Sequence, residues 1–493
     1  SLASYFYRRA EKAAPQISLL SRVAVLVAGA ICIGLCLFGI RGRMGYNPIK
    51  VSQAYYCEDP FLNQLGVNPV FNLLTSTLDD NRKENRTLHL MSEEDALSKV
   101  QKYLHRQGID RLSPIARKVE REGTPNRRNV VLVFMESMSA NLMGTFGSDK
   151  KLTPYLDSLY QQSLSFSHFY SSGIHTNHGI YSTLYSFPAI MKRNAMKGSV
   201  IPVYSGLPTV LQENGYCNLF FMTHESQYDN MNAFLRTNGF DEIYAQENYP
   251  SEKVVNSFGV QDDFMYQYAL PILNERAGTG NPFFSVLLSI SNHPPYVIPP
   301  YFHPHSDVLE EQIVEYADWS IRQFMQAAEK QPWFDNTIFV FLGDHGKMVG
   351  TPECEMPQSY NHIPLMIYGK DIKPGVYDGF GGQVDVSPTL LGLLNISYLQ
   401  NNFGVNLLEE ERPCMFFTAD NLIGARDSVN MFIYSPDSQQ EFKYKLEEGK
   451  LHAATGTDEE AFRNLKDYCF SMLQSTESLV KEHKTLDKVS VKK

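Results

Sequence analysis

The residues best suited to chemistry in this sequence are an adjacent carboxylate and imidazole, Asp344 and His345, which stand between Gly343 and Gly346. Glycines on both sides let the backbone turn tightly enough for the two side chains to face one point. Together with the distant Glu136 they form a set of oxygen and nitrogen ligands that suits Mn²⁺, Mg²⁺ or Zn²⁺. A solvated Asp-His turn is the alternative. We predict a divalent-metal site held by these three side chains.

A hydroxyl between two histidines marks the loop SSGIHTNHGIYST at residues 171–183, where Thr176 lies between His175 and His178. The stretch 179–183 is predicted to begin a helix, whose N-terminal amides favour an anion. A threonine hydroxyl is a weak nucleophile until a base or a metal activates it, and the predicted metal would supply that activation. Thr176 is therefore the candidate nucleophile, and the two histidines are candidates to protonate the leaving group. A plain turn without a catalytic role is the alternative.

Short apolar runs from Asn129 onward predict the strands that position these side chains. The runs are VVLVFM (130–135), NLFFMT (218–223), FFSVLLSIS (283–291), TIFVFL (337–342) and PLMIYG (364–369). Continuous runs rich in Val, Ile and Phe are typical of strands buried on both faces. Helical stretches lie between them, and in residues 310–330 apolar positions recur at spacings of three and four. This alternation predicts an α/β domain with a mostly parallel central sheet and helices on both faces.

Polar residues follow four of these runs at the point where each predicted strand ends. In open α/β sheets, ligands bind beyond the carboxyl ends of the strands. The residues in that position are Glu136, His224, Asn292 with His293, and Asp344 with His345. A single polar residue there could simply cap its strand, but four such strand ends together predict one site.

An apolar segment near the start of the chain, residues 23–40, predicts a membrane helix. At about 1.5 Å per residue it nearly crosses a hydrocarbon core of roughly 30 Å, and the span extends to about residues 17–40 if Arg22 reaches towards the headgroups. A cleaved signal peptide fits less well, because Arg41, Gly42 and Arg43 follow instead of a small-residue cleavage site. A buried soluble helix is a further alternative. Basic residues flank both ends, so the orientation stays open, and the start at Ser1 is consistent with earlier membrane helices missing from this sequence.

Composition and patterning predict the remaining organisation of the 493 residues. A net charge of −10 without a basic stripe argues against a nucleic-acid partner. We expect a membrane segment at 1–43, a helical connector at 44–125, a catalytic α/β domain at 126–412 and a C-terminal β/α extension at 413–493. In the connector, Ser92 and the acidic residues after it predict a capped helix start. The extension is expected to complete the edge of the central sheet.

The motifs VFMES and GDHG, the threonine-bearing loop and SNHPPY together resemble the alkaline phosphatase/sulfatase superfamily. Within it, the chain is similar to the lipoteichoic acid synthase-like membrane phosphotransferases, from roughly the membrane helix, including NQLGVNPVFNLL, to about residue 400. The resemblance implies one divalent metal, most often Mn²⁺, at Glu136, Thr176, Asp344 and His345. It also implies a catalytic domain outside the bacterial cytoplasmic membrane and a contact between His293 and the substrate phosphate.

The resemblance further implies a reaction. A phosphoglycerol-type headgroup would pass from a membrane phospholipid to a hydroxyl-bearing acceptor of the cell envelope through a covalent intermediate on Thr176. The alternatives are a sulfatase-like or phosphodiesterase hydrolase, a phosphoethanolamine transferase, and a catalytically silent lipid-binding protein. Sulfatases of this superfamily need Cys or Ser in a C/S-x-P-x-R context, whereas this loop has threonine at the key position and no proline or arginine in place.

The substrate pocket departs from the family pattern, because the tryptophan/arginine contact with glycerol phosphate has no clear counterpart here. The stretch THESQYDNMNAFLRTNGFDEIY offers His224, Asn230, Asn232 and Arg236 instead, and His178 and His293 complete the expected substrate-binding set. Lys347, after GDHG, is interpreted as a surface lysine, with a phosphate contact as the alternative. His362 would either join the site or satisfy a loop carbonyl.

Overall fold

The computed structural model describes residues 18–43, 49–57, 60–80, 82, 87–109, 112–198, 201–447, 449–454 and 459–487. The chain divides into two compact units, Ser1–Gln53 and Ala54–Lys493. The first unit contains helix α2 (Leu19–Arg41), which begins after Ser18, whose hydroxyl accepts the backbone N–H of Ser21. Every residue of α2 is exposed, and the helix is long and apolar enough to cross a membrane. The predicted span is therefore a helix, and Ile17 lies outside the described residues.

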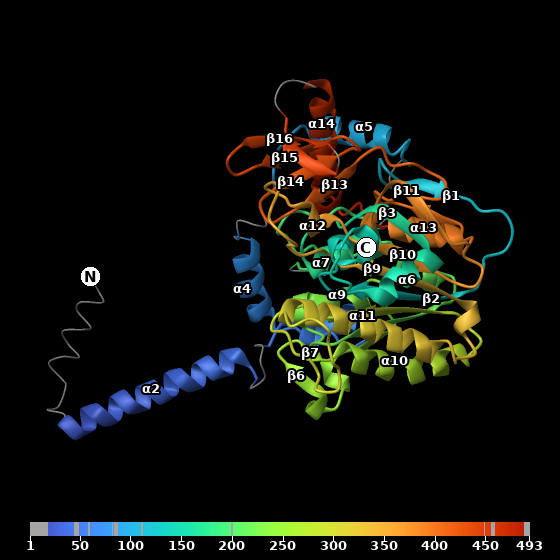
Figure 1. The fold of residues 1–493 in the computed structure, drawn as a ribbon. Coiled ribbons are helices and arrows are strands. Elements are labelled where there is room, and N and C mark those ends of the chain that lie inside the picture. Colours follow the sequence, from blue (N-terminus) through green and yellow to red (C-terminus); the bar gives the residue numbers. More distant parts are fainter. Residues whose placement is uncertain are drawn as a thin grey trace. The chain divides into compact units, whose positions relative to one another are not determined.

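The second unit contains the other helices and the strands (Figure 1). The helices are α3 (Pro60–Leu65), α4 (Pro69–Asp80), α5 (Glu93–Tyr103), α6 (Pro154–Gln162), α7 (Thr176–Tyr185), α8 (Leu207–Glu213), α9 (Met231–Thr237), α10 (Asp262–Ala277), α11 (Leu309–Ala328), α12 (Gln358–Asn361), α13 (Val386–Leu393) and α14 (Glu459–Lys481). The strands are β1 (Arg117–Val119), β2 (Asn129–Met135), β3 (Leu164–Tyr170), β4 (Cys217–Met222), β5 (Glu242–Tyr244), β6 (Val254–Asn256), β7 (Gly259–Val260), β8 (Phe283–Leu288), β9 (Thr337–Gly343), β10 (Leu365–Tyr368), β11 (Gly375–Gly382), β12 (Tyr398–Gln400), β13 (Met415–Thr418), β14 (Ile423–Arg426), β15 (Asn430–Ser435), β16 (Gln440–Glu447) and β17 (Lys450–Ala453).

An eight-stranded central sheet organises this unit, in the order β11-β3-β10-β9-β2-β8-β4-β5. Each predicted apolar run forms a strand of this sheet, and the mostly parallel α/β architecture is confirmed. One strand runs the other way, because β10 pairs antiparallel with both β3 and β9. The run 364–369 identifies a buried strand, but an apolar composition carries no information about the direction in which a strand is traversed.

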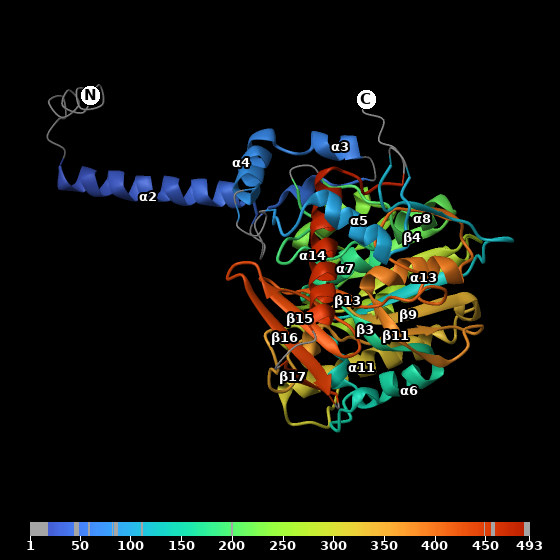
Figure 2. The ribbon, with the colours of Figure 1, turned by 90° about the horizontal axis from the view of Figure 1, so that it is seen from above.

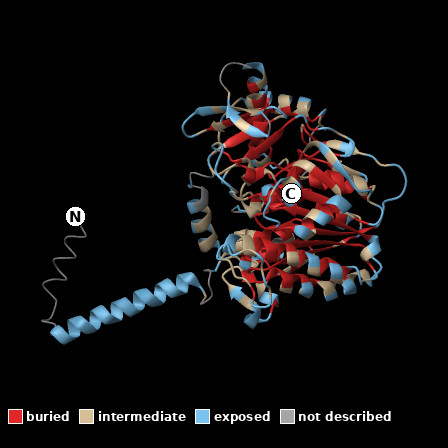
Figure 3. Ribbon diagram, viewed as in Figure 1, coloured by how far each residue is buried: buried red, intermediate tan, exposed pale blue. Residues whose placement is uncertain are grey.

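Helices cover both faces of the central sheet, as predicted (Figures 2 and 3). On one face, α6, α10 and α11 pack on alternate strand residues such as Val131, Val133 and Phe341. On the other face, α7, α8 and α13 contact one another, and α8 contacts β4. Strands buried on both sides therefore make up the core, and their ends lie between two helical layers.

The C-terminal residues form a sheet of their own. Strands β13 to β17 make a five-stranded antiparallel sheet, and the edges of the central sheet are β11 and β5. The expectation that the extension completes the central sheet is therefore wrong, because the hairpins of residues 415–453 pair with each other in sequence order. Helix α14 packs on β14 and β15, and α5 packs on α14. Helix α5 begins as predicted, since the Ser92 hydroxyl accepts the Asp95 N–H at 3.2 Å.

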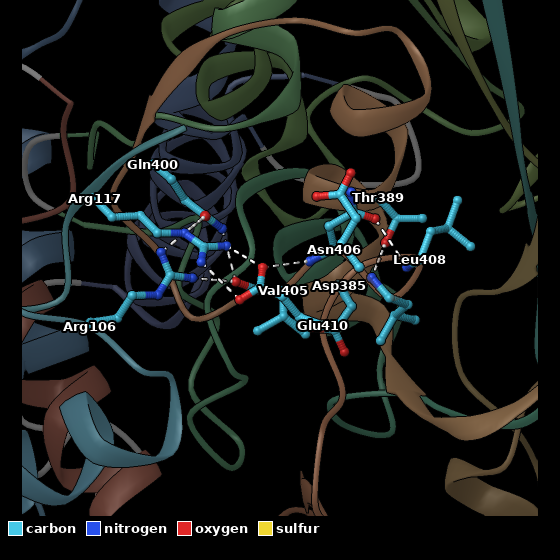
Figure 4. Close-up of polar contacts among 12 residues, drawn as sticks. Arg106, Arg117, Asp385, Thr389, Gln400, Val405, Asn406, Leu408 and Glu410 are labelled. Carbon is cyan, nitrogen blue, oxygen red and sulfur yellow. Dashed lines mark hydrogen bonds and ion pairs between the residues drawn. The ribbon is translucent and has the colours of Figure 1, made fainter. Parts of the chain in front are cut away.

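A network of hydrogen bonds connects the region around β1 to residues 400–410 (Figure 4). Arg117 donates to both carboxylate oxygens of Glu410 and to the side-chain oxygen of Gln400. Arg106, 5% exposed, donates to the same Gln400 oxygen at 3.0 Å and to the Gly404 carbonyl at 2.8 Å. This part of the expected connector therefore belongs to the same compact unit as the sheet, while the boundaries at residues 43, 125 and 412 stay predictions.

Candidate active site

Four neighbouring parallel strands deliver polar residues to one edge of the central sheet. The strands β4, β8, β2 and β9 are adjacent, and their last residues are level, since Met135 pairs with Gly343 and Phe134 pairs with Leu288. The polar residues beyond their carboxyl ends are His224, Asn292 with His293, Glu136, and Asp344 with His345. The parallel register therefore brings together side chains that lie more than 200 positions apart in the sequence.

Glu136, Asp344 and His345 form a group whose ligand atoms all lie within 4.8 Å of one another. The imidazole Nε2 of His345 is 3.7 Å from Glu136 Oε1 and 3.5 Å from Asp344 Oδ2. Backbone contacts orient the group, because Asp344 Oδ1 accepts the N–H groups of Ser137 at 2.8 Å and of His345 at 2.7 Å. The Ser137 hydroxyl donates to Glu136 Oε1 at 2.7 Å. Carboxylate and imidazole atoms thus converge on one point.

The electrostatics of this group fit a cation. Glu136 and Asp344 are 1% and 0% exposed, so two carboxylates lie side by side away from bulk solvent. Burial, and then the charge of Asp344, raise the pKa of Glu136 well above its usual range. Asp344 Oδ2 has no hydrogen-bond partner among the described residues. A buried acceptor without a donor beside a second carboxylate is costly unless a positive ion is bound there, so these residues suit a divalent metal.

Thr176 approaches this group from helix α7, which covers the face of the sheet opposite α6, α10 and α11. It is the first residue of α7, so the prediction that the helix begins in residues 179–183 is wrong by one turn. The Thr176 hydroxyl donates to Glu136 Oε2 at 3.4 Å. A side chain at Gly179 would place its Cβ 2.2 Å from the Asp344 carbonyl oxygen, so the first turn of α7 lies directly against the strand end. The Thr176 hydroxyl therefore faces Glu136, at the start of a helix whose N-terminal end favours negative charge.

Three of the predicted substrate-binding residues, His178, His224 and His293, lie around the same edge of the central sheet. His178 is 2% exposed, and neither of its ring nitrogens is hydrogen-bonded within the described part of the chain. Burial, and then His175 and His345, lower its pKa to about 3. An imidazole with this pKa is neutral at pH 7, so it has no extra proton to give to a leaving group.

His293 and His224 also have lowered pKa values, in each case mainly because of burial. His293 packs its ring on Phe258 at 4.2 Å between centroids, and its Nδ1 is 2.6 Å from the Pro294 carbonyl oxygen. Its Nε2 forms no hydrogen bond with the backbone of the described residues. His224 bonds the Glu225 carbonyl through Nδ1, and its buried Nε2 has no partner among the described residues. Both imidazoles are therefore held by the backbone with the second nitrogen available.

Two other predicted residues are not brought to the metal group. Asn230 donates to the Met196 carbonyl, and Arg236 donates to Asn232 on its own helix α9. Asp229, the residue before Asn230, contacts the threonine loop instead. Its Oδ2 accepts the side-chain amide of Asn177, the residue after Thr176, at 3.0 Å. Sequence reasoning missed Asp229, because nothing in its residue type distinguishes it from the polar residues around it.

Lys347 is not the surface lysine that its sequence position suggested. Its ammonium donates to Asn292 Oδ1 at 2.6 Å and lies 5.6 Å from the centre of the Tyr296 ring. Burial lowers its pKa to about 8. Asn292 in turn donates to the carbonyls of Glu136 and Ser137. A half-buried ammonium whose hydrogen-bond partner is a neutral amide is suited to an anionic ligand. Its position directly after the GDHG motif was the signal in the sequence.

His362 and His175 have partners away from the metal group. His362 satisfies a carbonyl, that of Ser167, at 2.9 Å through Nε2, which is the second of its two expected roles. His175 Nε2 lies 2.5 Å from Asp420 Oδ1, in the loop between β13 and β14. Asp420 was not anticipated, and this contact connects the threonine loop to the C-terminal sheet.

Comparison with known proteins agrees with this geometry. The sulfatase family model matches residues 128–396. The chain is 25% identical over 362 residues to the lipoteichoic acid synthase-like YvgJ of Bacillus subtilis, covering 66% of this chain and 56% of that protein. It is 24% identical over 400 residues to lipoteichoic acid synthase of Staphylococcus aureus, covering 71% and 58%. The chain thus spans little more than half the length of these curated relatives.

Two solved structures have the same fold. One is an alkaline phosphatase superfamily protein from Vibrio parahaemolyticus, with a TM-score of 0.73 and 25% identity over 80% of this chain and 97% of that one. The other is the lipoteichoic acid synthase LtaP from Listeria monocytogenes, with a TM-score of 0.63 and 22% identity over 78% and 98%. The chain therefore belongs to the sulfatase family.

Within the alkaline phosphatase/sulfatase superfamily, the chain is a lipoteichoic acid synthase-like member. Members of this superfamily use a divalent metal, and the group of Glu136, Asp344 and His345 is a matching set of ligands.

Proposed function

We propose that this protein is a membrane-anchored phosphotransferase, which moves a phosphoglycerol-type headgroup from a membrane phospholipid to a hydroxyl of the cell envelope. The observation that carries the proposal is the Thr176 hydroxyl at the start of α7, 3.4 Å from Glu136 in a lipoteichoic acid synthase-like chain. A sulfatase-type aldehyde cannot form from threonine, whereas an oxygen nucleophile for phosphorus can.

The reaction has two displacements at phosphorus. Thr176 Oγ1 forms a bond to the phosphorus of the lipid headgroup as the bond to the diacylglycerol oxygen breaks, and that oxygen takes up a proton equivalent to the one lost by Thr176. The acceptor hydroxyl then forms the new bond, loses its proton and releases Thr176 Oγ1, which is protonated again. Each step exchanges one P–O bond for another, so no oxidant or cofactor is consumed.

The surrounding residues have distinct parts in this scheme. Glu136, Asp344 and His345, with Thr176, would hold one divalent metal, for which Mn²⁺ is the first candidate and Zn²⁺ or Mg²⁺ are alternatives. Such an ion lowers the pKa of a hydroxyl and neutralises phosphoryl oxygens. Lys347 and His293 offer donors to the non-bridging phosphate oxygens, and the α7 amides favour the same negative charge. His224 and His178 line the headgroup side.

Anchoring supports a lipid donor. Helix α2 is long and apolar enough to span a bilayer, and a tethered enzyme meets headgroups at a high effective concentration. We place the catalytic unit outside the cytoplasmic membrane of a bacterium, as the resemblance implies.

The direct test is mass spectrometry of the Thr176 peptide after incubation with phospholipid vesicles and Mn²⁺. We expect a phosphoglycerol adduct on Thr176 in the parent protein and none in Thr176→Ala, whose turnover should fall by about 10³-fold or more. Thr176→Ser, which keeps a hydroxyl, is the matched control and should retain an adduct. An unmodified Thr176 with full turnover would refute the covalent mechanism.

The same measurement separates the alternatives. An ethanolamine phosphate adduct would identify the other headgroup. Release of free headgroup phosphate without transfer to an added hydroxyl acceptor would identify a hydrolase. An absence of both adduct and turnover at saturating metal would support a silent lipid-binding protein.

A further inference from the structure

Helix α4 (Pro69–Asp80) has its two faces reversed relative to a helix that packs on a protein core. After Pro69, the exposed positions among residues 70–78 are Val70, Leu73, Leu74, Thr77 and Leu78, and the four apolar side chains are between 60% and 68% exposed. Its less exposed positions are Phe71, Asn72, Thr75 and Ser76. At 3.6 residues per turn each set forms one continuous face. An amphipathic helix of a globular domain normally turns its apolar face inward, whereas α4 turns it outward.

The hydroxyl groups of α4 are hydrogen-bonded within the helix. Thr75 donates its hydroxyl to the Phe71 and Asn72 carbonyls, and Thr77 donates to the Leu73 carbonyl at 2.7 Å. Ser76 also donates to Leu73, at 3.1 Å. Hydroxyls bonded to their own helix are tolerated in an apolar environment, because no donor is left unpaired.

The start of the helix is satisfied in the same way. The side-chain oxygen of Asn68 accepts the backbone N–H groups of Val70 and Phe71, at 3.0 and 3.1 Å. No charged side chain interrupts the exposed face between residues 70 and 78. Leu65, in the preceding helix α3, adds an apolar side chain that is 69% exposed. The face therefore has the character of a lipid-contacting surface over about two turns.

The length of the chain between α2 and α3 indicates what covers the apolar face of α4, namely the bilayer. Residues 42–59 join the end of α2 to the start of α3, and 18 residues reach at most about 65 Å even when fully extended. A bilayer crossed by α2 would therefore lie within about 65 Å of the start of α3. A face of five residues is far smaller than the roughly 20–30 residues that each partner contributes to a specific protein–protein interface, but one apolar helix face is enough for a helix lying in a membrane surface.

We propose that α4 lies in the membrane–water interface, with Val70, Leu73, Leu74 and Leu78 inserted among the lipid acyl chains. This inference rests on the membrane anchoring proposed above. It assigns a second contact of the protein with the bilayer, after α2, so that the site would receive lipids from the membrane to which the protein is bound.

Fluorescence quenching tests the contact without any need for activity. The full chain is reconstituted in phosphatidylcholine/phosphatidylglycerol vesicles as Leu74→Trp and, for comparison, as Val376→Trp, at a position 58% exposed in β11. The parent protein provides the background of Trp319 and Trp333. We expect lipids brominated on the acyl chains to quench Leu74→Trp at least twofold more than Val376→Trp, and aqueous acrylamide to quench it less.

Two results would overturn the proposal. Equal quenching of both variants by acrylamide would place residue 74 in water. Protection of Leu74→Trp from acrylamide and from brominated lipid alike would mean that protein, such as a second copy of this chain, covers the helix.

A kinetic comparison gives a second readout. In Leu74→Glu/Leu78→Glu we expect turnover of vesicle phospholipid to fall about tenfold, while hydrolysis of a soluble diester, bis(p-nitrophenyl) phosphate, stays unchanged; Val376→Glu should affect neither. Unchanged vesicle turnover, or an equal loss on both substrates, would count against the lipid contact. If the parent protein acts on neither substrate, the proposed reaction fails, and the fluorescence result still decides the position of α4.

Discussion

Each carboxylate of the candidate metal site is oriented through one oxygen. Asp344 Oδ1 accepts two backbone N–H groups, which leaves Oδ2 free of hydrogen bonds within the described residues. Glu136 Oε1 accepts the Ser137 hydroxyl, and its Oε2 faces the Thr176 hydroxyl. Second partners of this kind hold a ligand in place before the metal arrives, so binding need not order flexible side chains.

Lys347 is the residue whose role the structure changes most. We expect Lys347→Met to lower kcat/KM for the phospholipid about 10- to 100-fold, because a hydrogen bond to a charged group contributes about 1.5–3 kcal/mol. Steady-state kinetics would measure this, and the loss should fall mainly on KM if the ammonium binds substrate and transition state alike.

Two controls define the role of Lys347. Lys347→Arg keeps the charge and should recover much of the lost activity, and the melting temperature of both variants should stay near that of the parent protein. Activity of Lys347→Met within twofold of the parent value would mean that the ammonium does not contact the phosphate.

At the scale of elements, the site depends on how closely α7 approaches the end of β9. Gly179 is one turn beyond Thr176, and its Cα faces the Asp344 carbonyl. Gln383 completes the junction by donating to the carbonyls of Gly343 and Asp344, at 3.1 and 2.6 Å. The helix that carries the candidate nucleophile Thr176 is thus held against the end of β9, where the candidate metal ligands Asp344 and His345 follow.

Gly179→Ala tests this junction. The new methyl group would stand 2.2 Å from the Asp344 carbonyl oxygen, and α7 must move to relieve the clash. We expect a loss of about 1–3 kcal/mol in the free energy of unfolding and weaker Mn²⁺ binding, measured by denaturant titration and isothermal calorimetry. Gly375→Ala, where nothing lies within 4 Å of the new atom, is the control and should change neither. Unaltered metal affinity in Gly179→Ala would refute the close approach.

At the scale of the whole molecule, we expect the buried carboxylates to make stability depend on a bound metal. Glu136 and Asp344 are both buried, beyond the ends of the neighbouring strands β2 and β9. A ligand that binds only the folded chain stabilises it by an amount set by its concentration and affinity. Without a cation, burial and the neighbouring charge of Asp344 raise the pKa of Glu136, because the surrounding medium screens the two carboxylates poorly.

Asp344→Asn is expected to separate folding from metal binding. Asparagine keeps the oxygen that accepts the Ser137 and His345 N–H groups and removes one buried charge, so the metal-free variant should be at least as stable as the metal-free parent protein. Mn²⁺ at 100 times its dissociation constant should add about 2.7 kcal/mol to the parent protein and little to the variant.

Thermal unfolding with and without a chelator would measure both quantities. An equal gain from Mn²⁺ in the parent protein and in Asp344→Asn would show that the ion binds elsewhere. Recovery of the parent protein's stability after metal is added back would exclude irreversible damage by the chelator.

Much of the fold and of the metal group could be predicted from local patterns. A continuous apolar run such as 337–342 identifies a buried strand by composition, and a polar residue at its end, such as Asp344, occupies the carboxyl edge wherever the strands run parallel. The capped start of α5 at Ser92 was predictable for the same reason, since a cap is satisfied within one turn of its own helix.

Long-range pairing and burial could not be predicted in the same way. The direction of β10, the separate sheet of residues 415–453 and the first residue of α7 depend on which surfaces meet, and a strand or helix of given composition can meet several. Three further features also depend on which surfaces meet. They are the burial of Lys347 against Asn292, the approach of Asp229 to Asn177 and the outward apolar face of α4.

The sequence by itself determined which side chains could bind a metal and attack phosphorus, because residue type and position at a strand end are local properties. The tertiary structure decided which of them share one site, since only the packed sheet and helices set the distances between residues remote in the chain. The distance of 3.4 Å between Thr176 and Glu136 is such a property: forty positions separate them, and the contact exists because two helical layers enclose one sheet edge.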